Sequence, residues 1–478
     1  MSGTNARLMA AAFLVLILGG TAWGQHHPPT ATVPAAMDPA KWQDDLRFFA
    51  AELPQRHKNL FHKMPREQFE AAIRRLDARI PALQRHEIIV ELARIVAMIG
   101  DGHTHMSIGF DSRIGFRRYP IELEQFKDGL FVRAASPEYA HAVGGRVIRI
   151  GKSPTEQAMA AVREIVARDN EMWVGFLGPR LLAMPEVLAG LGLVEDMEKV
   201  PWAVEKDGKQ FTVEFRPVAA DPNRNMHAFG PPPEWVDMRS GAAAPTPLWL
   251  KDPNNSFWYE YLPDSRTLYV QYNEVANKPD ETVRAFFQRV YQFVDANPVD
   301  RFVLDLRLNG GGNNFLNLPI IHGLIRSDKV NQKGKLFTII GRRTFSAAQN
   351  CVNQLERHTQ TLFVGEPTGA IPNHYGDARR IVLPNSGIGV QASTLWWQDV
   401  DPRDRRPWTA PHIAAEMTST DYRTNCDPVL EAILRYSDRK PLADLVRGAV
   451  EKKEIEAARQ AIRDYRADPQ NAYANFEA

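Results

Sequence analysis

The chain has 478 residues, of which 44% are hydrophobic and 24% are charged. This mix is typical of a globular protein and excludes a fibrous or disordered one, and the length predicts two or three domains. The 58 Lys and Arg residues nearly cancel the 57 Asp and Glu residues. That balance excludes a broadly basic nucleic-acid-binding protein.

The first 24 residues have the pattern of a secretory signal peptide. Arg7 precedes an apolar run over residues 8–20, and small residues at Ala22 and Gly24 flank the expected cleavage position. The run is shorter than the roughly 20 residues that span a bilayer. We therefore expect an exported protein, periplasmic or extracellular, with no stable membrane insertion after cleavage. Residues 25–39 are rich in Pro and Ala and predict a flexible leader.

The next two segments differ in their hydrophobic period. Apolar residues at helical spacing over 69–80 and 88–99, the second run ending at Gly100, predict an N-terminal helical domain over 40–112. From 113 to 218 the sequence predicts a β-rich domain with one helix over 154–167. Its strands cover 119–134 and 146–150, and a hairpin over 202–215 turns at Asp207-Gly208. Residues 219–250 are rich in Pro and Gly and predict a linker.

The segment 251–435 alternates strands and helices. Strands are predicted over 267–272, 302–307, 336–340 and 361–364, and helices over 280–295, 315–325 and 346–357. Such alternation predicts a parallel sheet with right-handed crossovers, and hence a multi-domain α/β protein. A charge-rich helical tail is expected over 436–478.

Two turns of this sheet carry residues suited to nucleophilic catalysis. Glycines 310–312 follow one buried strand, and Ser346 stands where the next strand gives way to a helix. Both turns open on the carboxyl edge of the sheet, where ligands bind. A serine hydroxyl facing a glycine-rich turn supplies a nucleophile and an oxyanion hole, with donors from Ala347 and from Gly310 or Gly311. Two simpler interpretations remain open: Ser346 as a helix N-cap, and the glycines as a turn or a phosphate site.

At these turns the chain resembles a known family. The stretches DLRLNGGGNN (305–314), GRRTFSAAQN (341–350), VGEPTGAIPNHYGD (364–377) and PHIAAEMTSTDYRTNCDPVLEAIL (411–434) are similar, in order and spacing, to segments of the tail-specific (carboxyl-terminal processing) and tricorn-type serine proteases. Residues 100–104 match a further motif. The resemblance covers residues 40–435. It implies a crotonase-like core, a PDZ-like domain over 113–218, and a peptidase that acts on peptides or unfolded proteins.

The resemblance also bears on the general base. The tail-specific branch uses a lysine just after a turn that here reads 365–371, but no lysine lies between Lys335 and Lys440. The tricorn-like branch uses a histidine, and His103 occupies that motif position. A neutral imidazole is a suitable base for a serine near neutral pH. Gly102 stands where that branch has a further serine. The acid that orients His103 is left open among four aspartates: Asp101, Asp399, Asp401 and Asp404.

The sequence gives less support to other functions. An α/β-hydrolase would show a G-x-S-x-G elbow around its serine, which this chain lacks. His103 and His105 alone do not make a metal site, so no metal or cofactor is expected. Cys351 and Cys426 are either bridged or free. The alternative from another class is a non-proteolytic binding protein for apolar ligands on the same fold.

Overall fold

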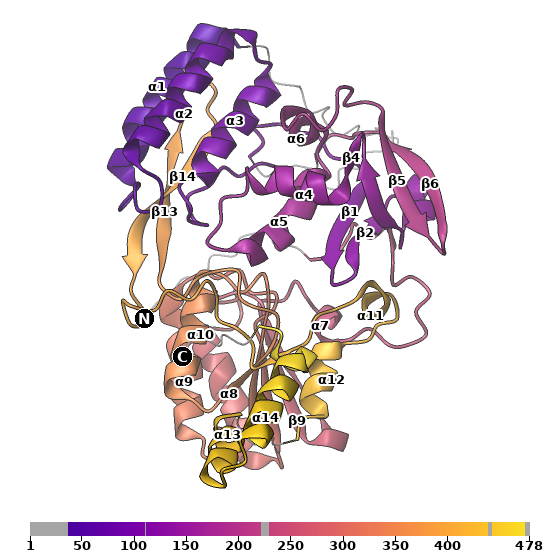
Figure 1. Ribbon diagram of the computed structural model, residues 1–478, viewed down its shortest axis with the longest axis vertical. Coiled ribbons are helices and arrows are strands. Elements are labelled where there is room, and N and C mark those ends of the chain that lie inside the picture. The colour runs from indigo at the N-terminus through magenta and orange to yellow at the C-terminus, as the bar shows by residue number, and fades with distance from the viewer. Residues whose placement is uncertain (1–36, 110, 221–228, 438–441, 474–478) are drawn as a thin grey trace, which may run out of the picture. The chain divides into compact units, whose positions relative to one another are not determined.

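The computed structural model describes residues 37–109, 111–220, 229–437 and 442–473 (Figure 1). The expected signal peptide and residues 25–36 of the leader lie outside this part of the chain. Among the described residues, no helix is both long enough and apolar enough to cross a bilayer. Both cysteines are free thiols, Cys351 buried and Cys426 partly exposed.

Three helices form the N-terminal layer: α1 (Pro39–Arg56), α2 (Arg66–Arg79) and α3 (Arg85–Ala97). Asp38 caps α1 by accepting the amide of Ala40, and a capping box of Gln84 and Glu87 begins α3. The predicted helices over 69–80 and 88–99 are confirmed, since their apolar stripes face the core. The chain leaves α3 through Gly100, whose φ of 85° favours glycine.

The β-rich segment is an antiparallel sheet in the order β1-β2-β3-β5-β6, with β4 and β7 at its margins. Its strands are β1 (Ile121–Phe126), β2 (Gly129–Ala135), β3 (Arg146–Ile150), β4 (Ser153–Pro154), β5 (Val200–Lys206), β6 (Lys209–Phe215) and β7 (Val236–Asp237). The predicted hairpin is confirmed, because β5 and β6 pair around Asp207 and Gly208, both at positive φ.

Helices α4 (Thr155–Arg163), α5 (Glu171–Leu182) and α6 (Pro185–Gly190) lie between β4 and β5. The sequence predicted only the first of them. Asn170 caps α5 by accepting the amide of Met172, and α5 contains Pro179 near its end. Because Gly and Pro within a helix obscure its pattern, α5 was not predicted, although it lies next to the candidate site.

The predicted parallel sheet is confirmed. Its strand order is β15-β12-β11-β10-β9-β8, with β8 antiparallel at one edge. The strands are β8 (Phe257–Leu262), β9 (Thr267–Tyr272), β10 (Arg301–Asp305), β11 (Leu336–Ile340), β12 (Leu362–Gly365) and β15 (Ile413–Ala414). Helices α8 (Val283–Ala296), α9 (Leu318–Arg326) and α10 (Ala347–His358) connect them. The central strands are wholly buried, which explains their continuous apolar runs.

A two-stranded hairpin of β13 (His374–Val382) and β14 (Gly389–Trp397) was not predicted. It leaves the parallel-sheet segment and packs beside α1, as Figure 1 shows in orange against indigo. The Ser393 carbonyl accepts the amide of Lys58, and His105 exchanges two backbone hydrogen bonds with Gln391. This hairpin therefore holds the loop that follows α3.

The remaining segments differ in part from expectation. The described part of the predicted linker is packed, because β7 pairs with β2 and both Trp249 and Leu250 of α7 (Leu248–Lys251) are buried. The carboxyl-terminal tail is helical as predicted, with α13 (Leu442–Glu451) and α14 (Ile455–Ala467) following α11 (Ser419–Arg423) and α12 (Pro428–Leu434).

Candidate active site

Ser346 occupies the first turn after β11, as the residue that precedes α10. Its φ is 53° and its ψ is −126°, a conformation that costs a non-glycine residue free energy. Thr344 holds this turn, since its hydroxyl donates to the Leu306 carbonyl (2.9 Å) and accepts the Gly341 amide (3.0 Å). Ser346 stands at the N-cap position, yet its side chain makes no capping hydrogen bond. The structure thus gives the hydroxyl no role in capping α10.

The glycine turn lies directly against Ser346. Gly311 has a φ of 107°, and a Cβ at this position would lie 2.6 Å from Ser346 Cβ and 2.9 Å from the Ala347 nitrogen. Phe345 donates its amide to the Asn309 carbonyl at 3.1 Å, which joins the two turns. Both turns are therefore at one edge of the sheet, as their positions after parallel strands predicted.

The three predicted oxyanion donors differ in availability. The Gly311 amide donates to the Asn309 side-chain oxygen at 2.9 Å, so it is already used. Within the described residues, the amides of Gly310 and Ala347 have no hydrogen-bond acceptor. Ala347 is also the first residue of α10, where the helix dipole favours negative charge. Gly310 and Ala347 remain as donors, while Gly311 allows the close approach.

His103 lies in a four-ring stack with Trp173, Phe345 and His374. Its ring centroid is 4.6 Å from that of Phe345 and 5.5 Å from that of His374, and Phe345 stacks in turn on Trp173 at 4.2 Å. Both ring nitrogens of His103 are buried and have no hydrogen-bond partner among the described residues. Burial, followed by the charge of His374, lowers the pKa of His103 to about 3. The ring is therefore neutral near pH 7. It contacts the serine turn through Phe345, the residue before Ser346.

Asp101 does not orient the His103 ring. Its carboxylate accepts from His57 Nε2 (2.8 Å), the Ser393 hydroxyl (2.8 Å) and the backbone amides of His103 (3.0 Å) and Thr104 (2.7 Å). Burial alone would raise the pKa of Asp101, but these hydrogen bonds outweigh it and lower the pKa. Asp101 thus fixes the backbone on which His103 stands.

The other three aspartates are also placed. Asp401 pairs with Arg403 and Asp404 with Arg406, each at 2.8 Å. Asp399 instead accepts hydrogen bonds from Asn350 and Asn353 of α10. Burial lowers the pKa of His374, and the charge of Asp399 opposes that effect. Of the three, only Asp399 acts on a ring of the four-ring stack, and it does so through His374.

Several residues of the site were not predicted. His374 and Trp173 belong to elements that the sequence did not indicate, and His57 lies 44 positions before its partner Asp101. Asp169 accepts the amide of Gly102 at 2.8 Å, and its other oxygen is buried without a partner. Burial and then the charge of Asp101 raise the pKa of Asp169 to about 7. Within the described chain, no group of three or more His, Cys, Asp or Glu residues is placed to hold a metal.

Comparison with solved structures shows which fold the chain has. No protein-family model and no curated protein matches the sequence. Among solved structures, the chain is similar to mature CPAF complexed with lactacystin, with a TM-score of 0.56 at 12% identity over 89% of this chain and 99% of that one. A mutant of CPAF matches with a TM-score of 0.56 at 10% identity, over 84% and 99%. The photosystem II D1 C-terminal processing protease matches with a TM-score of 0.38 at 12% identity, over 83% and 97%. The chain therefore has a mixed α/β fold, and in particular the fold of CPAF along nearly its whole length.

Proposed function

We propose that the protein is a serine peptidase that forms an acyl-enzyme on Ser346. The observation that carries this proposal is the conformation of Ser346. Its backbone is strained, its side chain does not cap α10, and it lies against Gly311 beside the amides of Gly310 and Ala347, which have no acceptor among the described residues. Backbone strain at a residue whose side chain has no structural role is typical of a functional residue. The segments that resemble tail-specific and tricorn-type proteases contain these same residues, and the fold is shared with CPAF.

The chemistry runs in two steps. The Ser346 hydroxyl attacks the carbonyl carbon of a peptide bond and gives its proton to His103. The amides of Gly310 and Ala347 bind the resulting oxyanion, each contributing about 3–4 kcal/mol to the barrier reduction. His103 then protonates the leaving amine as the C–N bond breaks. Water hydrolyses the ester by the same route in reverse.

His103 acts as the base after a movement of its ring. In the structure the ring stacks on Phe345 and neither nitrogen reaches a partner, whereas proton transfer needs a distance of about 3 Å to the hydroxyl. The Asp101 charge opposes the lowering of the His103 pKa. It therefore favours the imidazolium that forms when the ring accepts the proton.

Labelling by a fluorophosphonate tests the nucleophile. We expect one adduct, on the peptide that contains Ser346, and none in Ser346→Ala. Ser437→Ala, at an exposed serine outside the site, is the matched control and should label as the parent does. An adduct on another serine, or hydrolysis by Ser346→Ala at the parent rate, would remove Ser346 from this role.

A second experiment tests the base. His103→Ala should lower turnover of an unstructured polypeptide by roughly 10²–10⁴-fold, as loss of a general base does. His322→Ala, at an exposed histidine of α9, should not. Full activity in His103→Ala would exclude His103 as the base.

The alternative function is binding of apolar ligands without hydrolysis, which an apolar cavity next to His103 favours. Absence of labelling, together with binding of an apolar fluorophore displaced by apolar ligands, would support it. The export of the protein also remains a proposal, based on residues 1–24. Amino-terminal sequencing after expression in the native host should find Gln25 first.

A further inference from the structure

The serine turn, residues 341–346, is held by more than the glycine turn. A second turn, residues 365–369, begins at the end of β12 and lies beside it. The Gly369 amide donates to the Thr344 carbonyl at 3.0 Å and so joins the two turns. A strained residue such as Ser346 persists only where its surroundings over-determine its conformation. The contacts between the serine turn and its neighbours therefore bear directly on the nucleophile.

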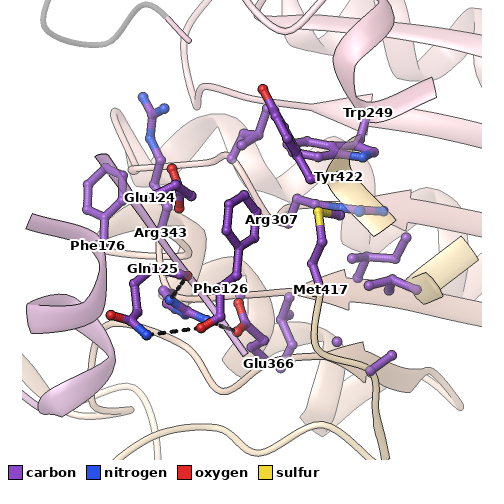
Figure 2. Close-up of a pocket in the computed structure, with 18 of the residues that line it drawn as sticks. Glu124, Gln125, Phe126, Phe176, Trp249, Arg307, Arg343, Glu366, Met417 and Tyr422 are labelled. Atoms are coloured by element: carbon purple, nitrogen blue, oxygen red, sulfur yellow. Dashed lines mark hydrogen bonds and ion pairs between the residues drawn. The ribbon is translucent and has the colours of Figure 1, made fainter. Parts of the chain in front are cut away.

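The side chain of Arg342, in the serine turn, reaches both this second turn and the β-rich segment. Its Nε donates to Glu366 Oε1 at 2.9 Å, and its Nη2 donates to the same oxygen. Its Nη1 donates to the main-chain carbonyl of Gln125, in β1, at 2.7 Å. Figure 2 shows these contacts as dashed lines at Gln125 and Glu366. One guanidinium therefore connects the serine turn, the turn after β12 and the end of β1.

Two glycines leave the space that Arg342 occupies. A Cβ at Gly369 would lie 2.2 Å from the Arg342 carbonyl oxygen, which is closer than van der Waals contact. A Cβ at Gly175 of α5 would lie 3.3 Å from Arg342 Cδ. Both the backbone and the side chain of Arg342 are thus packed against neighbouring segments. Because protein interiors are close-packed, Arg342 cannot shift without moving these segments.

The ion pair of Arg342 and Glu366 is largely shielded from water. The two side chains are 17% and 21% exposed. Burial alone would lower the pKa of Arg342, but the charge and the hydrogen bond of Glu366 outweigh burial and raise the pKa. Glu124 of β1 adds to the effect of Glu366 through its charge. Loss of the Arg342 guanidinium would therefore leave the partly buried Glu366 carboxylate without this partner, which destabilises the turn after β12.

We propose that Arg342 is a positioning residue for the nucleophile, and that its contacts with Glu366 and β1 keep Ser346 in its strained conformation against Gly311. Arg342 and Ser346 belong to the same turn, so the effect of Arg342 runs through the backbone of residues 342–346. This role rests on the proposed peptidase function, because it requires that Ser346 reacts.

The rate of fluorophosphonate labelling at Ser346 tests this role. Arg342→Met keeps an apolar stem and removes the guanidinium. It should lower the labelling rate by roughly 10–100-fold, since a displacement of about 1 Å at a reacting group has effects of this size. Arg342→Lys keeps the charge but not the planar fork, so its rate should lie between those of the parent and Arg342→Met. Urea denaturation of each variant shows the conditions in which it is folded, and the rates are compared there.

Arg406→Met is the matched control. Arg406 binds both carboxylate oxygens of Glu356, near the end of α10, at 2.8 and 2.9 Å. This variant also removes a guanidinium–glutamate pair, and it does so on the helix that follows Ser346. It should therefore lower the stability of the protein, while its labelling rate should stay within about twofold of that of the parent.

Glu366→Gln shows whether Arg342 and Glu366 act as a unit. Glu366→Gln should also slow labelling, and adding it to Arg342→Met should change the rate by less than about twofold, because the partner is already lost. Losses that multiply in the double variant would contradict the pair. A folded Arg342→Met that labels at the parent rate, or an equal loss of rate in Arg406→Met, would overturn the proposal. If Arg342→Met does not fold, Arg342→Lys and Glu366→Gln decide by the same rates.

Hydrogen exchange separates this test from the test of function. The amides of Thr344 and Phe345 are hydrogen-bonded in the structure, and they should exchange faster in Arg342→Met than in the parent, whether or not Ser346 reacts. A parent that labels, with the same rate and the same exchange in Arg342→Met, would remove the role of Arg342 and leave the peptidase. A parent that does not label, with faster exchange in Arg342→Met, would remove the peptidase and leave Arg342 as the residue that holds the turn.

Discussion

At the scale of single residues, Gly311 decides how the site is built. Its positive φ and its contact with Ser346 leave no space for a side chain, whereas a Cβ at Gly310 would meet no atom within 4 Å. The two glycines are adjacent in sequence, and nothing in the sequence separates their roles. Asn309 adds to the difference, because it accepts the Gly311 amide and leaves that of Gly310 available.

Substitution of these two glycines gives the first prediction. Gly311→Ala should lower fluorophosphonate labelling and peptide turnover by roughly 10²-fold or more, because the added Cβ displaces Ser346 from the oxyanion donors. Gly310→Ala keeps its amide and should retain activity within about threefold. The labelling rate is measured by quenching the fluorophosphonate reaction at set times, and turnover is measured with a fluorogenic peptide. Equal losses in the two variants would contradict this assignment.

Residue types alone predicted part of the site. Ser346, Gly310 and Ala347 were predicted from two turns on neighbouring parallel strands, because short-range pattern and sheet topology together fix their position. The partners of Asp101 were not predictable in this way. The Asp101 carboxylate joins His57 and Ser393, which lie 44 and 292 positions away, and no local pattern reports such contacts.

At the scale of elements, the β13–β14 hairpin holds the loop that carries His103. The sequence did not indicate this hairpin, since charged and aromatic residues on its exposed face obscure the alternation. On its buried face, Ser393 donates to Asp101 (2.8 Å) and accepts from Thr104 (3.1 Å). Helix α5 was not predicted for a different reason, its internal Gly and Pro. It nevertheless provides Trp173 and Arg180 to the wall of the cavity beside His103.

The hairpin gives the second prediction. Ser393→Ala should lower the free energy of unfolding by about 1–3 kcal/mol, since it leaves a buried carboxylate with one donor fewer. It should also lower kcat, because it loosens the backbone that carries His103. Thr394→Ala, on the opposite face of β14, is the matched control. Urea denaturation measures the stability of the two variants, and steady-state kinetics measures their turnover. Equal effects of Ser393→Ala and Thr394→Ala would contradict the role of Ser393 in holding the loop of His103.

At the scale of the whole molecule, stability depends on a carboxyl group in the catalytic region. Asp169 lies between α4 and α5, accepts the Gly102 amide, and has its second oxygen buried without a partner. Burial and the charge of Asp101 raise its pKa to about 7, against about 3.9 in an unfolded chain. Between these two values the folded protein keeps a proton that the unfolded chain releases.

The third prediction follows from the sign of this difference. Because the folded-state pKa is raised, the contribution of Asp169 is fully present below about pH 4 and is lost as the pH rises through about 7. Asp169→Asn does not titrate, so its free energy of unfolding relative to the parent should rise by roughly 2–4 kcal/mol between pH 4 and pH 8. Urea denaturation of both proteins across this range measures the difference. Asp169→Ala should show the same slope at a lower stability, because it also removes the acceptor for Gly102. A difference that stays constant with pH would show that Asp169 ionises in the folded protein as it does in the unfolded chain.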